Sequence, residues 1–290
     1  MDAASANGNG HARLHGERLT LAYESRVISQ DLDVEIPDGS FTVIVGPNAC
    51  GKSTLLRSLA RMLKPKAGQV VLDGKAIDSV PSKQVARRLG LLPQSPTAPD
   101  AITVADLVAR GRYPHQGLLR QWSKEDEVEV QSAMRATGVD ELADRAVDEL
   151  SGGQRQRVWL AMALAQQTPI LLLDEPTTFL DIAHQIEVLD LCAELHEREG
   201  RTLVAVLHDL NHACRYATHL IAMSQGRIVA EGAPSGIVDA AMVEQVFGLP
   251  CQVIEDPVTG TPLVVPGARS SRAAAAAERA AAAPHAAPAA

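Results

Sequence analysis

A glycine-rich loop that ends in lysine and serine carries the strongest chemical signal in the sequence. Residues 46–53 read GPNACGKS and fit the pattern G-x-x-x-x-G-K-[ST] without a gap. Glycines let backbone N–H groups turn inward around an anion, and a helix that begins at the loop adds its partial positive charge. An apolar strand precedes the loop and an apolar-periodic helix follows it, which disfavours a chance glycine-rich turn. We predict a phosphate-binding loop made by Gly46, Pro47, Asn48, Ala49, Cys50, Gly51, Lys52, Ser53 and Thr54.

Two carboxylates follow a second apolar run. Residues 170–175 read ILLLDE, so Asp174 and Glu175 come after four consecutive apolar residues. In phosphoryl-transfer sites the loop lysine, here Lys52, reaches the terminal phosphates, and the loop hydroxyl, here Ser53, binds Mg²⁺. Asp174 can meet the same Mg²⁺, directly or through water, while Glu175 orients and deprotonates the attacking water. Many strands end in an acidic turn, so the hydrolysis signal comes from pairing this run with the phosphate loop.

A third glycine-rich stretch, LSGGQ at residues 150–154, precedes an apolar-periodic helix over residues 155–166. Ser151 is a natural N-cap, and the two glycines after it allow close backbone approach. The result is a second helix N-terminus suited to a phosphate. One chain cannot easily bring both helix starts to one phosphate, whereas two chains arranged head to tail can. Without the other two motifs, an ordinary glycine-rich helix start would be the favoured interpretation of this stretch.

Strands and helices, which must position these residues, alternate along the chain. Strands are expected over residues 14–23, 27–36, 41–45, 70–72, 170–173 and 202–207, with a strand pair over 220–224 and 226–231. Helices are expected over residues 53–62, 182–198 and 210–216. Residues 103–148 have a mainly helical pattern, with Ser123 and Asp126 forming a capping box. This order predicts an α/β sheet core that contains an inserted helical block.

Residues 150–154 resemble the signature motif of ABC-transporter ATPases, and the other marks of that family follow in the family's order. In this resemblance residues 46–53 are the Walker A loop and residues 170–175 are the Walker B strand. Tyr23 is similar to an aromatic residue that stacks on adenine. Gln94 resembles the Q-loop glutamine that contacts Mg²⁺ and senses the membrane partner. Taken alone, Tyr23 would be an ordinary strand aromatic and Gln94 an ordinary loop residue.

Two further positions belong to this resemblance. Asp181 resembles the D-loop aspartate, and His208 resembles the switch histidine that contacts the γ-phosphate. A zinc site is the alternative for His208, since His212 and Cys214 lie close to it in the sequence. The absence of an HExxH pattern and the presence of Asp209 beside His208 favour the switch role.

The resemblance implies an ATPase that uses ATP with Mg²⁺ and works as a homodimer. The implied catalytic residues are Glu175, His208 and Lys52, and the implied Mg²⁺ ligands are Ser53, Gln94 and Asp174. The residues that would bind the partner's ATP are Ser151, Gly152, Gly153 and Gln154. Two departures from the family pattern stand out: Ala49 where glycine is frequent, and Phe179 where many relatives have a small residue.

The implied fold is α/β, a P-loop NTPase core with an antiparallel β subdomain and an inserted α-helical subdomain. We expect the ATPase domain over residues 12–266, with the helical insert at about 95–150. Residues 1–11 are small and polar, and residues 267–290 are alanine-rich. We expect both ends to be flexible tails, because neither offers apolar side chains large enough to bury.

Three stretches resemble the ATPases of bacterial ferric-siderophore importers, which are similar to those for vitamin B12 and haem. They are residues 109–115 (ARGRYPH), 177–185 (TTFLDIAHQ) and 257–266 (PVTGTPLVVP). The resemblance implies integral membrane permease subunits as partners and, through them, an extracytoplasmic substrate-binding protein. The chain would then lie peripherally on the cytoplasmic side of the cell membrane. Importers of vitamin B12, haem or another metal chelate are the alternative cargo classes.

Composition and charge disfavour several other classes of protein. The 290 residues carry a formal net charge of −8, which gives no electrostatic reason to bind nucleic acid. No apolar run approaches the ~20 residues that cross a bilayer, and no secretory signal begins the chain. The four cysteines form no CxxC pair and are expected to be reduced, mostly buried thiols. The alternatives to an importer ATPase are a soluble non-transport ABC ATPase, a non-hydrolysing regulatory module and an exporter subunit.

Overall fold

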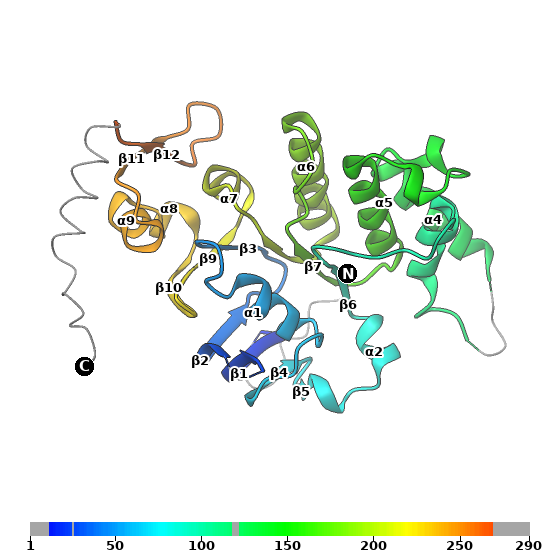
Figure 1. Ribbon diagram of the computed structural model, residues 1–290, viewed down its shortest axis with the longest axis horizontal. Helices are drawn as coiled ribbons and strands as arrows, with labels where there is room; N and C mark the ends of the chain where they lie inside the picture. Colours follow the sequence, from blue (N-terminus) through cyan, green and yellow to red (C-terminus); the bar gives the residue numbers. More distant parts are fainter. Residues whose placement is uncertain (1–11, 25, 118–121, 269–290) are drawn as a thin grey trace, which may run out of the picture.

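The computed structural model describes residues 12–24, 26–117 and 122–268 (Figure 1). A mostly parallel sheet forms the centre, with the strand order β10-β9-β3-β8-β7-β6. Strand β10 pairs antiparallel with β9, while β9, β3, β8, β7 and β6 run parallel to one another. The strands of this sheet are β3 (Phe41–Val45), β6 (Leu89–Leu92), β7 (Ile170–Asp174), β8 (Thr202–Val206), β9 (His219–Ser224) and β10 (Arg227–Gly232).

A second, antiparallel sheet lies below the central sheet in Figure 1, with the order β2-β1-β4-β5. Its strands are β1 (Leu14–Tyr23), β2 (Arg26–Ile36), β4 (Ala67–Leu72) and β5 (Lys75–Ala76). A separate antiparallel hairpin, β11 (Cys251–Glu255) with β12 (Pro262–Pro266), packs beside α7 and α9 near the C-terminal end.

The helices cover both faces of the central sheet and form the insert. They are α1 (Lys52–Leu59), α2 (Ser82–Ala86), α3 (Val104–Ala109), α4 (Lys124–Ala136), α5 (Gly152–Ala165), α6 (Ile182–Glu199), α7 (Leu210–Tyr216), α8 (Pro234–Ile237) and α9 (Ala240–Phe247). Short 3-10 turns occur at Ile77–Ser79, Arg110–Arg112, Asp140–Leu142 and Val147–Glu149.

The central strands are apolar throughout because both of their faces are covered. In β7, Leu171 and Leu173 face a core formed with helices α3, α5, α6, α7 and α9. The alternate residues Ile170 and Leu172 face a second core, shared with α1 and the antiparallel sheet. Since each Cβ alternates across a strand, one uninterrupted apolar run serves both cores. The sheet therefore forms a rigid platform whose strand ends carry the loops.

The predicted fold class is confirmed, as is the antiparallel pair β9–β10 around Gln225 and Gly226. The helix expected over residues 53–62 is wrong at its end, since α1 stops at Leu59 and Arg61 has a positive φ of 60°. The helical pattern expected through residue 148 is also wrong beyond α4. Gly138, with φ +62°, ends that helix, and 3-10 turns follow.

Several elements were not expected from the sequence, namely β5, α2, β6, α8, α9 and the hairpin β11–β12. Most of them are only two to five residues long, too short to show a clear period. The expected N-terminal tail, residues 1–11, lies outside the described residues. The expected C-terminal tail does too, apart from residues 267 and 268.

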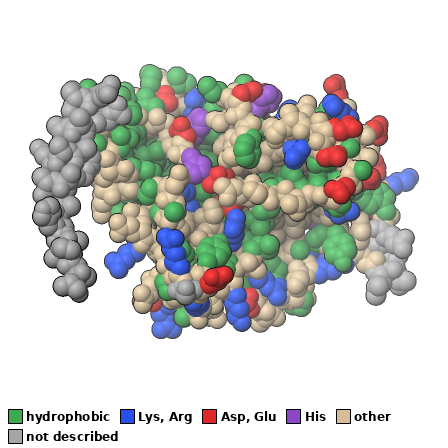
Figure 2. All heavy atoms as spheres, in the orientation of Figure 1, with side chains coloured by type: hydrophobic (Ala, Val, Ile, Leu, Met, Phe, Trp, Pro, Cys, Tyr) green, Lys and Arg blue, Asp and Glu red, His purple; other side chains and the backbone are tan. Residues whose placement is uncertain are grey.

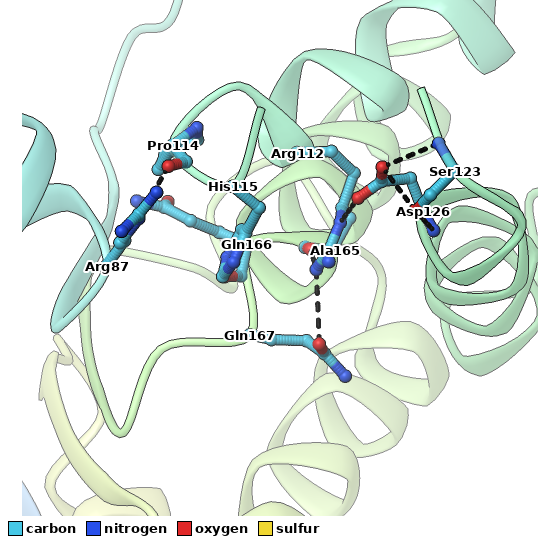
Figure 3. Close-up of polar contacts among 9 residues, drawn as sticks. All are labelled: Arg87, Arg112, Pro114, His115, Ser123, Asp126, Ala165, Gln166 and Gln167. Carbon is cyan, nitrogen blue, oxygen red and sulfur yellow. Dashed lines mark hydrogen bonds and ion pairs between the residues drawn. The ribbon is translucent and has the colours of Figure 1, made fainter. Parts of the chain in front are cut away.

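A buried ion pair fixes the helical insert (Figure 3). Arg112 is 2% exposed and donates from Nε to Asp126 Oδ1 at 2.9 Å and from Nη1 to the Ala165 carbonyl at 2.7 Å. Burial alone would raise the pKa of Asp126, but hydrogen bonds from Arg112 and Ser123 lower the pKa overall. Asp126 also completes the predicted capping box of α4 with Ser123. The C-terminal end of α5 is thereby held against the start of α4.

Two hydrogen bonds join the same segment to the core (Figure 3). Arg87, which follows α2, donates from Nε to the Pro114 carbonyl at 2.7 Å. His115 Nε2 lies 2.8 Å from the carbonyl of Gln166, just beyond α5. Residues 110–115 therefore connect the insert to the strand-bearing core.

Acidic side chains gather over the helical insert, at the upper right of Figure 2, whereas Lys and Arg concentrate towards the lower side, where the antiparallel sheet lies. The first turn of α4 contributes the exposed Glu125 and Glu127. Across the described part of the chain, no helix combines the length and apolar character needed to cross a membrane.

Candidate functional site

The predicted phosphate loop joins β3 to α1 in a conformation that its glycines permit. Gly46 has φ +152°, and a Cβ there would lie 2.2 Å from the Met223 carbonyl oxygen, so no side chain fits. Gly51 has φ +112° and forms the N-cap of α1. Ala49 also has a positive φ, 61°, which explains why glycine suits this position. The N–H groups at the start of α1 have no side-chain cap and are open to an anion.

A cavity of about 500 Å³ opens above this loop, and we call it the phosphate-loop cavity. It brings together ten of the predicted residues: Tyr23, Asn48, Ala49, Gly51, Lys52, Ser53, Thr54, Gln94, Glu175 and His208. Gly46, Pro47 and Cys50 belong to the loop but do not line the cavity. Cys50 is buried, and its carbonyl accepts a hydrogen bond from Gly226 N–H, so the β9–β10 turn supports the loop from behind.

Lys52 is 5% exposed and its ammonium folds back on the loop. Nζ donates to the carbonyls of Gly46 at 2.8 Å and Pro47 at 3.0 Å. These contacts hold the positive charge at the rim of the loop. Phosphate oxygens could take the place of the carbonyls, because charge-assisted bonds to phosphate are the stronger ones.

Ser53 and Asp174 meet between α1 and the end of β7. Ser53 Oγ donates to Asp174 Oδ1 at 2.8 Å, and Asp174 is 1% exposed. Burial raises the pKa of Asp174, against the opposing effects of Ser53 and Arg57. The second carboxylate oxygen, Oδ2, is buried without a hydrogen-bond partner. A buried oxygen without a partner, beside a hydroxyl, fits a hard cation such as Mg²⁺.

Glu175 and His208 pair directly, which the sequence did not predict. His208 Nε2 lies 2.8 Å from Glu175 Oε1, and Thr178 Oγ1 donates to Glu175 Oε2 at 3.2 Å. The Glu175 side chain is 10% exposed and that of His208 is 48% exposed. Glu175 also has a positive φ of 57°, an uncommon conformation that marks functional turns. Both oxygens of this carboxylate are therefore fixed towards the cavity.

The zinc alternative finds no support in this geometry. His208 contacts Glu175, while Cys214 is buried and its pKa is raised to about 11 by burial and by Asp209. Among the described residues, no group of three or more His, Cys, Asp and Glu side chains could hold a metal ion. Cys192 is likewise buried, which raises its pKa to about 12, and Cys251 is half-buried.

The predicted signature residues lie in a separate cavity of about 410 Å³, which we call the signature cavity. It is lined by Ser151, Gly152, Gly153, Gln154, Arg157, Phe179, Leu180, Asp181 and His184. Ser151 Oγ accepts from Gln154 N at 3.2 Å, and Gln154 Oε1 accepts from Ser151 N at 3.1 Å. Asp181 caps α6 and accepts from His184 Nδ1 at 2.8 Å. None of these residues lines the phosphate-loop cavity of the same chain.

Sequence reasoning missed several residues that line the phosphate-loop cavity or contact residues of the two cavities. Arg26 and Ile28 of β2 line the phosphate-loop cavity, and no local pattern marks them. Arg57 lies with Nε 3.8 Å from Asp174 Oδ2 and Nη1 3.4 Å from the Tyr23 hydroxyl. Its position four residues after Ser53, on the same helix face, is a signal that could have identified it. Gln156, which donates to the Pro176 carbonyl at 3.2 Å, links the signature helix to the loop after Glu175.

Comparison with known proteins gives consistent matches. The profile of the ABC transporter family matches residues 29–178. The chain is 61% identical to the ferric enterobactin transport ATP-binding protein of Escherichia coli (strain K12), over 90% of this chain and 96% of that protein. It is 55% identical to a petrobactin import ATP-binding protein of Bacillus anthracis, over 89% of this chain and 95% of that protein. A solved dimeric, post-hydrolysis ATP-binding cassette with ADP and Pi matches at TM-score 0.69 and 26% identity, over 76% of this chain and 98% of that chain.

Proposed function

Because this chain belongs to the ABC transporter family and is an ATPase of that family, we propose that it powers uptake of a ferric siderophore across the cell membrane. The observation that carries the cargo class is the high identity, over nearly the whole chain, to proteins named for ferric enterobactin and petrobactin. Two relatives with different named cargoes support a class, ferric siderophores, and do not identify one compound. Vitamin B12 and haem are the alternative cargoes, which the experiment below distinguishes from ferric siderophores.

ATP would bind in the phosphate-loop cavity. The open N–H groups of α1 and the Lys52 ammonium suit the phosphates, and the exposed ring of Tyr23 suits the adenine. Ser53, Asp174 and Gln94 would hold Mg²⁺, and the buried Oδ2 of Asp174, which has no hydrogen-bond partner, supports this assignment. When bound, Mg²⁺ would neutralise charge on the β- and γ-phosphates.

Hydrolysis would depend on Glu175 and His208. The fixed Glu175 carboxylate would orient the attacking water and accept its proton, a contribution of typically 10²–10⁴-fold for a positioned base. His208 Nε2 lies 2.8 Å from Glu175 Oε1 and would donate a hydrogen bond to it. A γ-phosphate oxygen would compete for that proton donor and leave Oε1 free to accept from water. The pair would thus sense whether the γ-phosphate is present.

The signature cavity would bind the ATP of a second copy. Ser151, Gly152, Gly153 and Gln154 open onto a cavity that contains no part of their own chain's phosphate loop. Two copies placed head to tail would supply each ATP with one phosphate loop and one signature helix. ATP would then favour the closed dimer by its higher affinity for that state. Release of phosphate after hydrolysis would reverse the preference and relax the dimer.

The remaining partners follow from the proposed transport role. Closure and opening of the dimer would be transmitted to permease subunits in the membrane through the insert and the Gln94 loop. An extracytoplasmic substrate-binding protein would deliver the chelate to the permease. The ATPase would lie peripherally on the cytoplasmic side of the membrane, because ATP must reach the phosphate-loop cavity.

Reconstitution tests the proposal. We would co-express the chain with candidate permease subunits and place the complex in liposomes. ATPase activity would then be measured with a ferric siderophore and its binding protein. Stimulation by the loaded binding protein, and not by the empty one, is expected. Stimulation by vitamin B12 or haem with their binding proteins instead would refute the siderophore assignment but keep the ATPase. A Glu175→Gln complex provides the background control.

A further inference from the structure

Phe179 is a large apolar side chain held in solvent by an unusual backbone. It is 76% exposed, and three residues later Ile182 is 78% exposed, while Leu180 between them is buried. The φ of Phe179 is +68°, in the left-handed region that non-glycine residues seldom occupy. Such a conformation persists only where the surroundings impose it, and it clusters at functional sites. The exposed ring is therefore a feature that needs an explanation.

The loop around Phe179 is held on both sides, so its exposure is built into the fold. Gln156 of the signature helix donates to the Pro176 carbonyl at 3.2 Å. On the other side, Gln185 of α6 donates to the Leu180 carbonyl at 3.1 Å. Within the loop, Thr178 N–H donates to the Glu175 carbonyl at 3.2 Å. These contacts fix the segment between the hydrolytic carboxylate and α6.

Phe179 stands at the edge of the signature cavity. It lines this cavity together with Ser151 and Asp181. A Cβ added to Gly152 would lie 3.5 Å from the Phe179 Cβ, and one added to Gly153 would lie 3.6 Å from the Phe179 carbonyl oxygen. Phe179 is thus held, through its Cβ and its carbonyl oxygen, next to the two glycines that would approach the partner's ATP.

We propose that Phe179, assisted by Ile182, is the apolar anchor through which a second copy of this chain docks in the ATP-bound dimer. The inference rests on the function proposed above. The occupant is a second copy because Phe179 lines the signature cavity, which holds no residue of its own chain's phosphate loop and which the proposed function assigns to the partner's ATP. The structurally similar cassette is itself dimeric. Buried aromatic residues surrounded by polar groups are the side chains that dominate protein–protein affinity.

Sedimentation velocity of the full-length chain tests the proposal. In a Glu175→Gln background with Mg-ATP, the dissociation constant of the dimer would be compared with and without Phe179→Ala. We expect at least a tenfold increase, the usual effect of truncating an interface anchor. Val258→Ala is the matched control, because Val258 is 79% exposed but lies in the β11–β12 turn. This control should leave the constant unchanged.

Two further variants separate anchoring from a structural role. Phe179→Gly removes both the ring and the strained φ, so we expect weaker dimerisation with an unchanged or higher melting temperature. Phe179→Tyr keeps the ring and should restore dimerisation. The affinity of the dilute monomer for a fluorescent ATP analogue should be the same in every variant.

The outcomes are distinguishable from failure of the proposed function. If Phe179→Ala and the control dimerise equally tightly, the anchor is refuted, and a loss of permease binding alone would assign the ring to the permease. If nucleotide binds but no variant dimerises, the proposed interface is refuted as a whole. If the Glu175→Gln chain itself binds no ATP, the proposed function fails with it.

Discussion

The phosphate-loop cavity and the signature cavity are built in opposite ways. In the first, the charged groups are buried and already paired: Lys52 contacts loop carbonyls, and Ser53 contacts Asp174. In the second, Ser151 and Gly152 are exposed, and the Asp181 side chain is 67% exposed. A buried polar group needs a hydrogen-bond partner within the chain, whereas an exposed polar group can bond to water until a ligand binds. The difference fits the proposed dimer, in which the phosphate-loop cavity of one chain holds an ATP and the signature residues of a second chain close over it.

The largest expected effect is on hydrolysis in the phosphate-loop cavity. Glu175→Gln removes the proton acceptor but keeps the shape of the side chain. We expect the ATPase rate to fall by about 10²–10⁴-fold, while calorimetry shows ATP affinity close to that of the unsubstituted chain. A rate within a factor of a few of the original would assign the base elsewhere.

The second effect concerns the insert, which carries the signature helix. Arg112→Met would leave the buried Asp126 carboxylate without its cationic partner, and we expect a loss of about 3–5 kcal/mol in the free energy of unfolding. Urea denaturation measures this loss. Since Arg112 also holds the C-terminal end of α5, dimerisation should suffer more than ATP binding by the monomer.

The same ion pair gives a pH dependence with a defined sign. The pKa of Asp126 is lowered in the folded chain, so its ionised form contributes stability above the unfolded pKa of about 3.9. This contribution is lost as the pH falls through the lower, folded pKa. Urea denaturation of the original chain should therefore show stability falling between about pH 5 and pH 3. Arg112→Met should show a smaller decline, and an equal decline would mean that other carboxylates cause it.

The third effect is on nucleotide affinity. Lys52→Ala removes a charged donor from the phosphate loop, and charged hydrogen bonds contribute about 1.5–3 kcal/mol. We expect ATP affinity to fall at least tenfold in calorimetry, with little change in melting temperature. Unchanged affinity would show that the loop N–H groups alone hold the phosphates.

The smallest effect is local to the signature helix. Ser151→Ala removes the N-cap of α5, which costs about 1 kcal/mol in thermal or chemical unfolding. Monomer binding of ATP should not change, because Ser151 does not line the phosphate-loop cavity. A clear loss of ATP binding by the dilute monomer would contradict the separation of the two cavities.

Much of the phosphate-loop cavity could be predicted from sequence because its chemistry is local. Residues 46–53 are consecutive, and the contact between Ser53 and Asp174 follows from a Mg²⁺-binding pattern. The pairing of Glu175 with His208 was not predicted. It arises because β7 and β8 are parallel neighbours, so that the residues beyond their C-terminal ends meet. Strand order is a tertiary property that no short motif encodes.

Other features depend on the fold in the same way. Arg26 and Ile28 reach the phosphate-loop cavity through the position of the antiparallel sheet, which the sequence pattern does not specify. The exposure of Phe179 was not predicted either, because an apolar residue between two threonines and a leucine gives no sign of a left-handed backbone. The short elements β6 and α2 were missed because four or five residues show too little periodicity.

Mixing two inactive variants tests most directly whether the two cavities serve different ATP molecules. Glu175→Gln inactivates one chain's phosphate-loop cavity, and Gly153→Asp places a negative charge in the other chain's signature cavity. In a mixed head-to-tail dimer both defects fall on one ATP, and the other ATP meets an intact pair of cavities. We predict ATPase activity well above the sum of the two variants measured separately. Activity that never exceeds that sum, in a mixture shown to exchange subunits, would contradict the account.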